Sequence, residues 1–146
     1  MSARLARIFL FTAGIALLAT GGAKIISVSG SARIMDVSDP IFGLSYKAVF
    51  WIVGGIESAI GCLCLVFESK ALNATLVAWV STNIIVYRMA LLLIDYRKPC
   101  PCLGSLTETI HISPITADVI LKLLSCYLVI GSYSTLFWLW KRGRFH

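Results

Sequence analysis

Two cysteines separated by a single residue, Cys100 and Cys102, carry the clearest chemical signal in this sequence, within the segment KPCPCLG. A disulfide between them would close a small, strained ring, and strained, exposed disulfides are the oxidising and labile ones. Pro99 and Pro101 restrict the backbone on both sides of Cys100, and Gly104 allows a tight turn after Cys102. The spacing therefore predicts a redox-active thiol pair.

The residues around this motif favour a reactive thiolate over other uses of the two cysteines. Arg97 and Lys98 lie beside Cys100, and nearby positive charge lowers the pKa of a cysteine thiol. Two other interpretations stay open: the cysteines pack as inert side chains or a permanent clasp, or they bind a metal together with His111. Because the spacing to His111 matches no standard zinc pattern, we expect no metal.

Three further cysteines lie in strongly apolar segments. Cys62 and Cys64 repeat the one-residue spacing, but residues two apart on a helix do not face each other. Cysteine in an apolar helix usually behaves as a small hydrophobic side chain. We expect structural roles for these two residues and for Cys126.

The composition indicates what kind of protein positions these side chains. Hydrophobic residues make up 58% of the 146 residues and charged residues 14%, against about 45–50% and about 25% in soluble domains. The chain is too apolar to be disordered, and one small domain has too little interior to bury so much apolar surface. A formal charge of +6 fits a membrane protein beside anionic lipid, so we expect lipid, and no nucleic acid, as a partner.

Four apolar segments are long enough to cross a membrane as helices. A spanning helix needs about 20 mainly apolar residues, and none of the segments alternates apolar with polar side chains as a strand would. They cover residues 5–28, 48–67, 71–94 and 115–140. The sequence therefore predicts an all-α fold, a single polytopic membrane domain over residues 1–146 built as a four-transmembrane-helix bundle.

The connections between these segments differ in character. Residues 68–70 form a tight turn, which predicts that the second and third helices are antiparallel neighbours. Residues 29–47 are long for a turn and leave room for a short interfacial helix. Ser113 and Pro114 have the residue types of an N-cap and a first helical position, so the fourth helix should begin there.

Four spans place both chain termini on the same side of the membrane. That side carries six basic residues close to the spans: Arg4, Arg7, Lys70, Lys141, Arg142 and Arg144. The other side carries four basic residues, Arg33, Lys47, Arg97 and Lys98, together with acidic residues that reduce its positive charge. By the positive-inside rule we expect cytoplasmic termini in a bacterial inner membrane, with the Cys-x-Cys loop in the periplasm. An alternative interpretation makes the first apolar segment a cleaved signal peptide.

Five charged side chains fall inside the predicted spans: Lys24, Glu57, Arg88, Asp118 and Lys122. Charges within a membrane are costly and are usually paired or functional. At about 1.5 Å per residue, all five lie in the half of the bundle beneath the Cys-x-Cys loop. They can be structural ion pairs, with Glu57–Arg88 the expected pair, or a polar pocket that tunes the thiols or receives a quinone head group.

Three of these features together resemble the MauE/DoxX-like family of four-helix membrane proteins, and its MauE branch most. The first helix ends in small residues followed by Lys24, the second carries Glu57 followed by Gly61, and the loop after the third holds Cys100-Pro101-Cys102-Leu103-Gly104. This resemblance, which runs along nearly the whole chain, implies a redox-associated membrane protein. The MauE branch is connected with maturation of a disulfide-rich periplasmic subunit.

The function we expect is thiol–disulfide exchange between the pair Cys100 and Cys102 and a periplasmic partner, either thioredoxin-like or rich in cysteine. Such exchange would assist the maturation or the electron supply of the partner. Two alternatives stay open. The protein is a non-enzymatic subunit or scaffold of a redox complex, with a structural Cys-x-Cys clasp, or it is a small transporter or lipid-binding protein whose intramembrane charges line a solute path.

Overall fold

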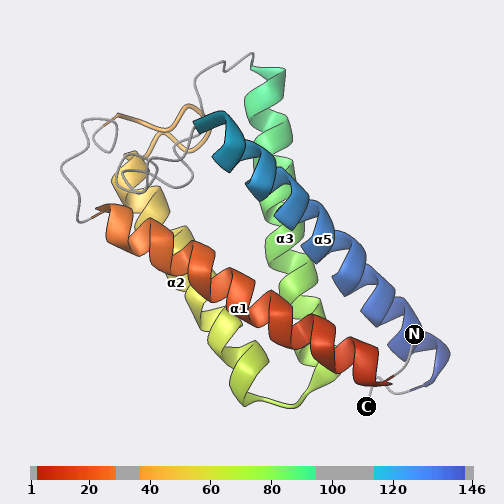
Figure 1. The fold of residues 1–146 in the computed structure, drawn as a ribbon. Coiled ribbons are helices and arrows are strands. Elements are labelled where there is room, and N and C mark those ends of the chain that lie inside the picture. Colours follow the sequence, from red (N-terminus) through yellow and green to blue (C-terminus); the bar gives the residue numbers. More distant parts are fainter. Residues whose placement is uncertain (1–2, 29–36, 95–113, 144–146) are drawn as a thin grey trace.

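A computed structural model describes residues 3–28, 37–94 and 114–143, in which four long helices form a bundle (Figure 1). The helices are α1 (Ala3–Val28), α2 (Tyr46–Val66), α3 (Lys70–Leu93) and α5 (Pro114–Lys141). Their ends lie within two residues of those predicted from the sequence. The predicted all-α four-helix bundle is confirmed, and the described residues contain no β-strand.

Each helix is long and apolar enough to cross a membrane. Large apolar side chains also face outward along the helices; on α1 these include Ile8, Phe11 and Ile15. In a soluble protein this outer surface would be costly to hydrate, whereas lipid tails are as apolar as the side chains themselves. The chain is therefore a multi-pass membrane protein by length, composition and surface.

The two ends of the bundle differ in what they carry. We call the end where α1 begins and α5 finishes the terminal end, and it also holds the α2–α3 turn at residues 67–69. The opposite end is the loop end, where α1 finishes, α2 begins, α3 finishes and α5 begins (Figure 1). The prediction that both ends of the chain lie on one side of the bundle is confirmed for the described residues.

Local side chains fix several helix boundaries. The Ser45 hydroxyl accepts a hydrogen bond from the Ala48 backbone N–H at 3.3 Å and so caps the start of α2. At the α2–α3 turn, the Asn73 amide donates to the Phe67 carbonyl at 2.7 Å, which satisfies a backbone acceptor that the helix end leaves free. The expected start of the fourth helix at Pro114 is confirmed.

The helices pack as two pairs. α1 makes its main contacts with α2, and α3 makes its main contacts with α5. In Figure 1, α2 and α3 leave their shared turn at the terminal end and separate toward the loop end. The prediction that α2 and α3 are antiparallel neighbours is therefore correct in direction, but they are neighbours only close to their turn, because each packs mainly on a different helix.

Glycines explain why α1 and α2 pack so closely. A Cβ atom added at Gly21 would lie 2.8 Å from the Gly54 carbonyl oxygen, and one added at Gly61 would lie 2.9 Å from that of Gly14. Small residues at such positions let two membrane helices approach through their backbones, and the gain in van der Waals packing holds them together. The close packing of α1 on α2 therefore requires glycine at these positions, because a side chain there would push the two backbones apart.

The apolar core lies mainly in the half of the bundle next to the terminal end. Its residues come from the first half of α1, the end of α2, the start of α3 and the middle of α5: Phe9, Leu10, Ala13, Leu17, Ile60, Cys64, Ala74, Val77, Val80 and Leu128. A smaller buried cluster, Val28, Tyr46 and Phe50, lies toward the loop end.

Phe9 holds α1 against α5 in this core. A Cβ added at Gly131 would lie 2.0 Å from the Phe9 ring, and that ring also makes an edge contact with Tyr127 at 5.4 Å between centroids. We expect Gly131→Ala to lower the free energy of unfolding by about 1–3 kcal/mol, the usual range for overpacking a core. Unfolding in mixed detergent micelles measures this change. In a Phe9→Leu background the same substitution should cost clearly less, and an equal cost in both backgrounds would contradict the contact.

Candidate functional site

Among the ion pairs of the described residues, the one between α1 and α2 is the most enclosed. The Lys24 ammonium lies 2.6 Å from the Oε2 atom of Glu57, and the two side chains are 14% and 1% exposed. In the described part of the chain, the other carboxylate oxygen of Glu57, Oε1, is buried and accepts no hydrogen bond. Glu57 therefore has one satisfied oxygen and one that is free to accept a hydrogen bond.

The predicted Glu57–Arg88 pair is wrong. The carboxylate of Glu57 pairs with Lys24, and the guanidinium of Arg88 lies 3.2 Å from Asp118 on α5. The cause is the packing of the helices: the glycine contacts bring α2 against α1, and α3 lies against α5. Lys122 completes this second cluster, with its ammonium 2.6 Å from Asp118 one turn away on the same helix.

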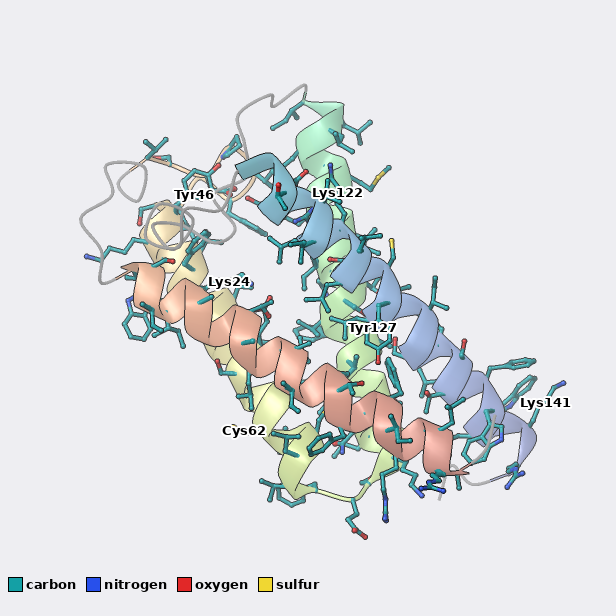
Figure 2. The ribbon with its side chains drawn as sticks, in the orientation of Figure 1. Lys24, Tyr46, Cys62, Lys122, Tyr127 and Lys141 are labelled. Carbon is teal, nitrogen blue, oxygen red and sulfur yellow. The ribbon has the colours of Figure 1, made fainter. Side chains whose placement is uncertain are left out.

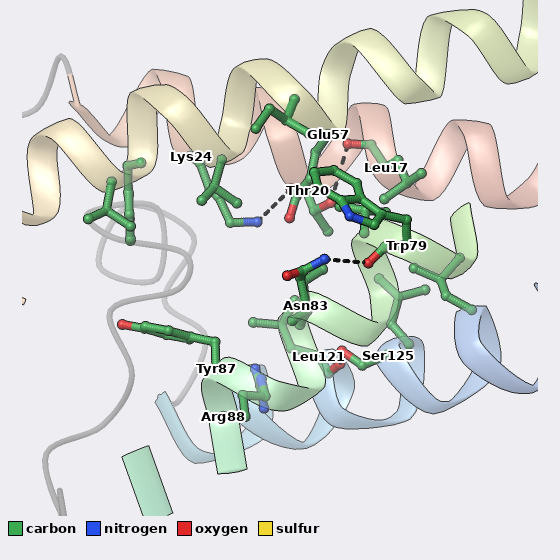
Figure 3. Close-up of a pocket in the computed structure, with 18 of the residues that line it drawn as sticks. Leu17, Thr20, Lys24, Glu57, Trp79, Asn83, Tyr87, Arg88, Leu121 and Ser125 are labelled. Atoms are coloured by element: carbon green, nitrogen blue, oxygen red, sulfur yellow. Dashed lines mark hydrogen bonds and ion pairs between the residues drawn. The ribbon is translucent and has the colours of Figure 1, made fainter. Parts of the chain in front are cut away.

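Between the two helix pairs lies a cavity of about 280 Å³ toward the loop end. Its wall is mainly apolar and aromatic and takes residues from all four helices, including Leu17, Tyr46, Phe50, Val53, Trp79 and Leu121 (Figure 3). Lys24, Glu57 and Arg88 line it, whereas Asp118, which is paired with both Arg88 and Lys122, does not. The five predicted intramembrane charges therefore form two ion-paired groups, and three of the five side chains face one cavity.

Residues 37–45 form a turn beside this cavity, where the sequence left room for a helix. Asp39 accepts hydrogen bonds on one carboxylate oxygen from the backbone N–H groups of Ile41 and Phe42, at 2.8 and 2.9 Å. Gly43 has a positive φ of 66°, which costs glycine little. The Phe42 side chain, carried by this turn, lines the cavity.

The turn is attached to α3 by a contact that was not predicted from the sequence. The Tyr87 hydroxyl donates a hydrogen bond to the second carboxylate oxygen of Asp39, and the Tyr87 ring stacks on Phe42 at 5.7 Å. Asp followed by Pro40 and, four positions on, by Gly43 is a recognisable turn signal. Nothing in the sequence indicated that Tyr87, 48 positions away, would receive that turn.

Three of the five cysteines lie within the described residues and two lie outside them. Cys62 and Cys126 are exposed and Cys64 is buried, all three as free thiols. Figure 2 shows Cys62 in the terminal-end half, far from Lys24. The residues of the predicted exchange site lie outside the described residues: Pro99, Cys100, Pro101, Cys102, Gly104 and His111. Within the part of the chain that is described, no group of three or more metal-ligating side chains comes together.

The fold and the cavity define a class of protein, a small four-helix membrane protein with a mainly apolar interhelical cavity that Lys24, Glu57 and Arg88 also line. Comparison of the chain with family models, with curated proteins and with solved structures finds no match. The resemblance to the MauE/DoxX-like family therefore stays a prediction that depends on the sequence motifs alone.

Proposed function

We propose that this protein exchanges disulfides with a soluble partner at the outer face of a bacterial inner membrane, through Cys100 and Cys102. The observation that carries the proposal is the Cys-x-Cys motif in the segment that joins α3 to α5. Both helices meet that segment at the loop end of the bundle, where the charged cavity lies (Figure 1). The two helix ends that flank the motif and the cavity therefore belong to the same half of the bundle.

The distribution of charge supports the orientation that this function needs. Arg4, Arg7, Lys70, Lys141 and Arg142 lie at the terminal end, where Glu68 is the acidic residue among those described. Basic residues close to membrane spans favour the cytoplasmic side. A cytoplasmic terminal end puts the loop end in the periplasm, which favours disulfides.

The proposed exchange needs no reactant other than the partner protein. A thiolate of the partner attacks the Cys100–Cys102 disulfide and forms a mixed disulfide, and the second thiol of the partner then releases it. The partner gains a disulfide, Cys100 and Cys102 become thiols, and two electrons and two protons move with them. The reverse direction supplies electrons to an oxidised partner. The partner class that fits is a thioredoxin-like or cysteine-rich periplasmic protein.

A reduced peptide with two cysteines tests this function on the purified protein in lipid nanodiscs. We expect the oxidised wild type to form a disulfide in the peptide, and Cys100→Ser and Cys102→Ser each to reduce the rate to that of the uncatalysed reaction. With the oxidised peptide in place of the reduced one, the remaining thiol of one single variant should attack the peptide disulfide and hold the peptide as a mixed disulfide, because the resolving thiol of the protein is missing. Mass spectrometry after alkylation measures both products.

The remaining cysteines provide matched controls for this experiment. Cys62→Ser and Cys126→Ser alter exposed thiols on α2 and α5, so each variant should retain the wild-type rate. A 100–102 disulfide that resists reduction well below the potential of glutathione would contradict exchange and indicate a permanent clasp. Zinc bound by Cys100, Cys102 and His111 would also contradict it.

A further inference from the structure

The unpaired oxygen of Glu57 marks an incomplete binding site. Its Oε1 atom is buried without a hydrogen bond in the described part of the chain, although Lys24 holds the other oxygen at 2.6 Å. A buried acceptor without a partner is costly, and such groups in folded proteins are usually satisfied by a neighbour, water or a ligand. Because Glu57 lines the cavity, a molecule there that donates a hydrogen bond would satisfy it.

A second polar group faces this oxygen across the cavity. Figure 3 shows the Asn83 amide on α3 opposite Lys24 and Glu57. Asn83 donates one hydrogen bond to the Trp79 carbonyl at 2.8 Å. A side-chain amide has a second N–H and an acceptor oxygen, so Asn83 can also bond to an occupant. The cavity therefore suits a molecule with polar atoms on two opposite sides.

The rest of the wall indicates how such a molecule enters. Ile56 of α2 and Trp79 of α3 line the cavity and are 36% and 54% exposed, at the middle of two membrane-spanning helices. The cavity therefore opens between α2 and α3 toward the lipid. Its volume of about 280 Å³ is near the lower end of small-molecule sites, enough for one ring and too small for a whole lipid. A ligand would place its head group inside and leave its tail in the membrane.

The charges favour an uncharged head group. Lys24 is neutralised by Glu57, and Arg88 is paired with Asp118. An anionic lipid head group at this place would meet the free oxygen of the Glu57 carboxylate and be repelled by it. We propose that the interhelical cavity binds the ring of a lipid-soluble quinone or its quinol, with Glu57, Lys24 and Asn83 as the polar contacts and the aromatic wall against the ring.

The polar contacts match both redox forms of such a ring. A quinol hydroxyl donates to Oε1 of Glu57, and a quinone carbonyl accepts from Lys24 or Asn83. If Cys100 and Cys102 perform the proposed exchange, the quinone takes two electrons and two protons from their thiols, which leaves a disulfide and a quinol. This second step depends on the proposed function, whereas binding of the ring does not.

Titration of the protein in nanodiscs with ubiquinone-1, a quinone with a short isoprenoid tail, tests the site. We expect saturable quenching of tryptophan fluorescence, because Trp79 lines the cavity. In a parallel titration with the reduced form, ubiquinol-1, Glu57→Gln should weaken binding at least about tenfold, because the quinol hydroxyl loses a hydrogen bond to a charged group. Val53→Phe, which fills the cavity from α2, should abolish saturation without removing a polar contact.

Matched variants show whether binding occurs in the cavity and whether it is independent of the cysteines. Glu68→Gln removes a carboxylate that is 88% exposed at the terminal end and should bind as the wild type does. The double variant Cys100→Ser/Cys102→Ser should lose disulfide exchange and keep quinone binding. The two proposals can therefore fail separately: a protein without exchange activity can still bind the quinone, and a protein that binds no quinone can still exchange disulfides. Absence of saturation in the wild type, equal binding by Val53→Phe, or displacement of the quinone by phosphatidylglycerol would overturn the assignment.

Discussion

Replacement of Lys24 by methionine is expected to lower the free energy of unfolding by about 3–5 kcal/mol, the cost of breaking a buried ion pair by removing one partner. The Glu57 carboxylate is 1% exposed, and Lys24 is the group paired with it. In the described part of the chain its other oxygen already lacks a hydrogen bond, so the variant would leave a buried carboxylate with no partner. Unfolding in mixed micelles, followed by circular dichroism, measures the loss.

Two further variants show whether the loss comes from the stranded charge. Lys24→Met/Glu57→Met removes both charges and should recover most of the stability, because a buried pair replaced by apolar side chains is often no less stable. Arg7→Met breaks a pair with Glu68 whose side chains are 69% and 88% exposed, and it should change stability by less than about 1 kcal/mol. A double variant as unstable as Lys24→Met would show that the stranded charge is not the cause.

Gly21→Ala should separate α1 from α2 and lower the free energy of unfolding by about 1–3 kcal/mol. The added Cβ would lie 2.6 Å from the Ser58 hydroxyl oxygen and 2.8 Å from the Gly54 carbonyl oxygen. The second of these atoms belongs to the backbone, so a rotamer change cannot relieve the contact. The same unfolding measurement detects the loss.

The adjacent glycine gives a control on the same helix. A Cβ at Gly22 would meet no atom within 4 Å, so Gly22→Ala should be neutral or slightly stabilising through its higher helix propensity. The two variants make the same substitution at about the same depth of the same helix, and they differ in whether the added Cβ atom meets α2. Equal effects from Gly21→Ala and Gly22→Ala would exclude the proposed helix contact.

The sequence was sufficient to predict the helices because their signal is local. Each span is a run of apolar residues long enough to cross a membrane. A boundary residue such as Pro114, which suits the first position of a helix, marks where a helix begins. It also indicated that the intramembrane charges would form ion pairs or line a polar pocket, since an isolated charge within a membrane is costly.

The choice of ion-pair partners could not be predicted because it depends on which helices pack together. Estimated depth along the helices placed Arg88 nearer than Lys24 to the level of Glu57, and so favoured the wrong partner. The deciding information lay in glycines away from the charges: Gly54 and Gly61 let α2 pack against α1. Taken as a helix interface, this small-residue pattern would have favoured Lys24 as the partner. The contact of Tyr87 with Asp39 has no local signal of any kind.

The two-pair architecture also has a consequence for biosynthesis. The main partner of α1 is the next helix along the chain, and the same holds for α3 and α5. Residues 3–66 can therefore form a complete helical hairpin while the ribosome is still making the second half. Contacts between neighbours in sequence also favour fast folding. The cavity, in contrast, exists only once both hairpins have met, so an occupant dissolved in the bilayer can be enclosed during the last step of assembly.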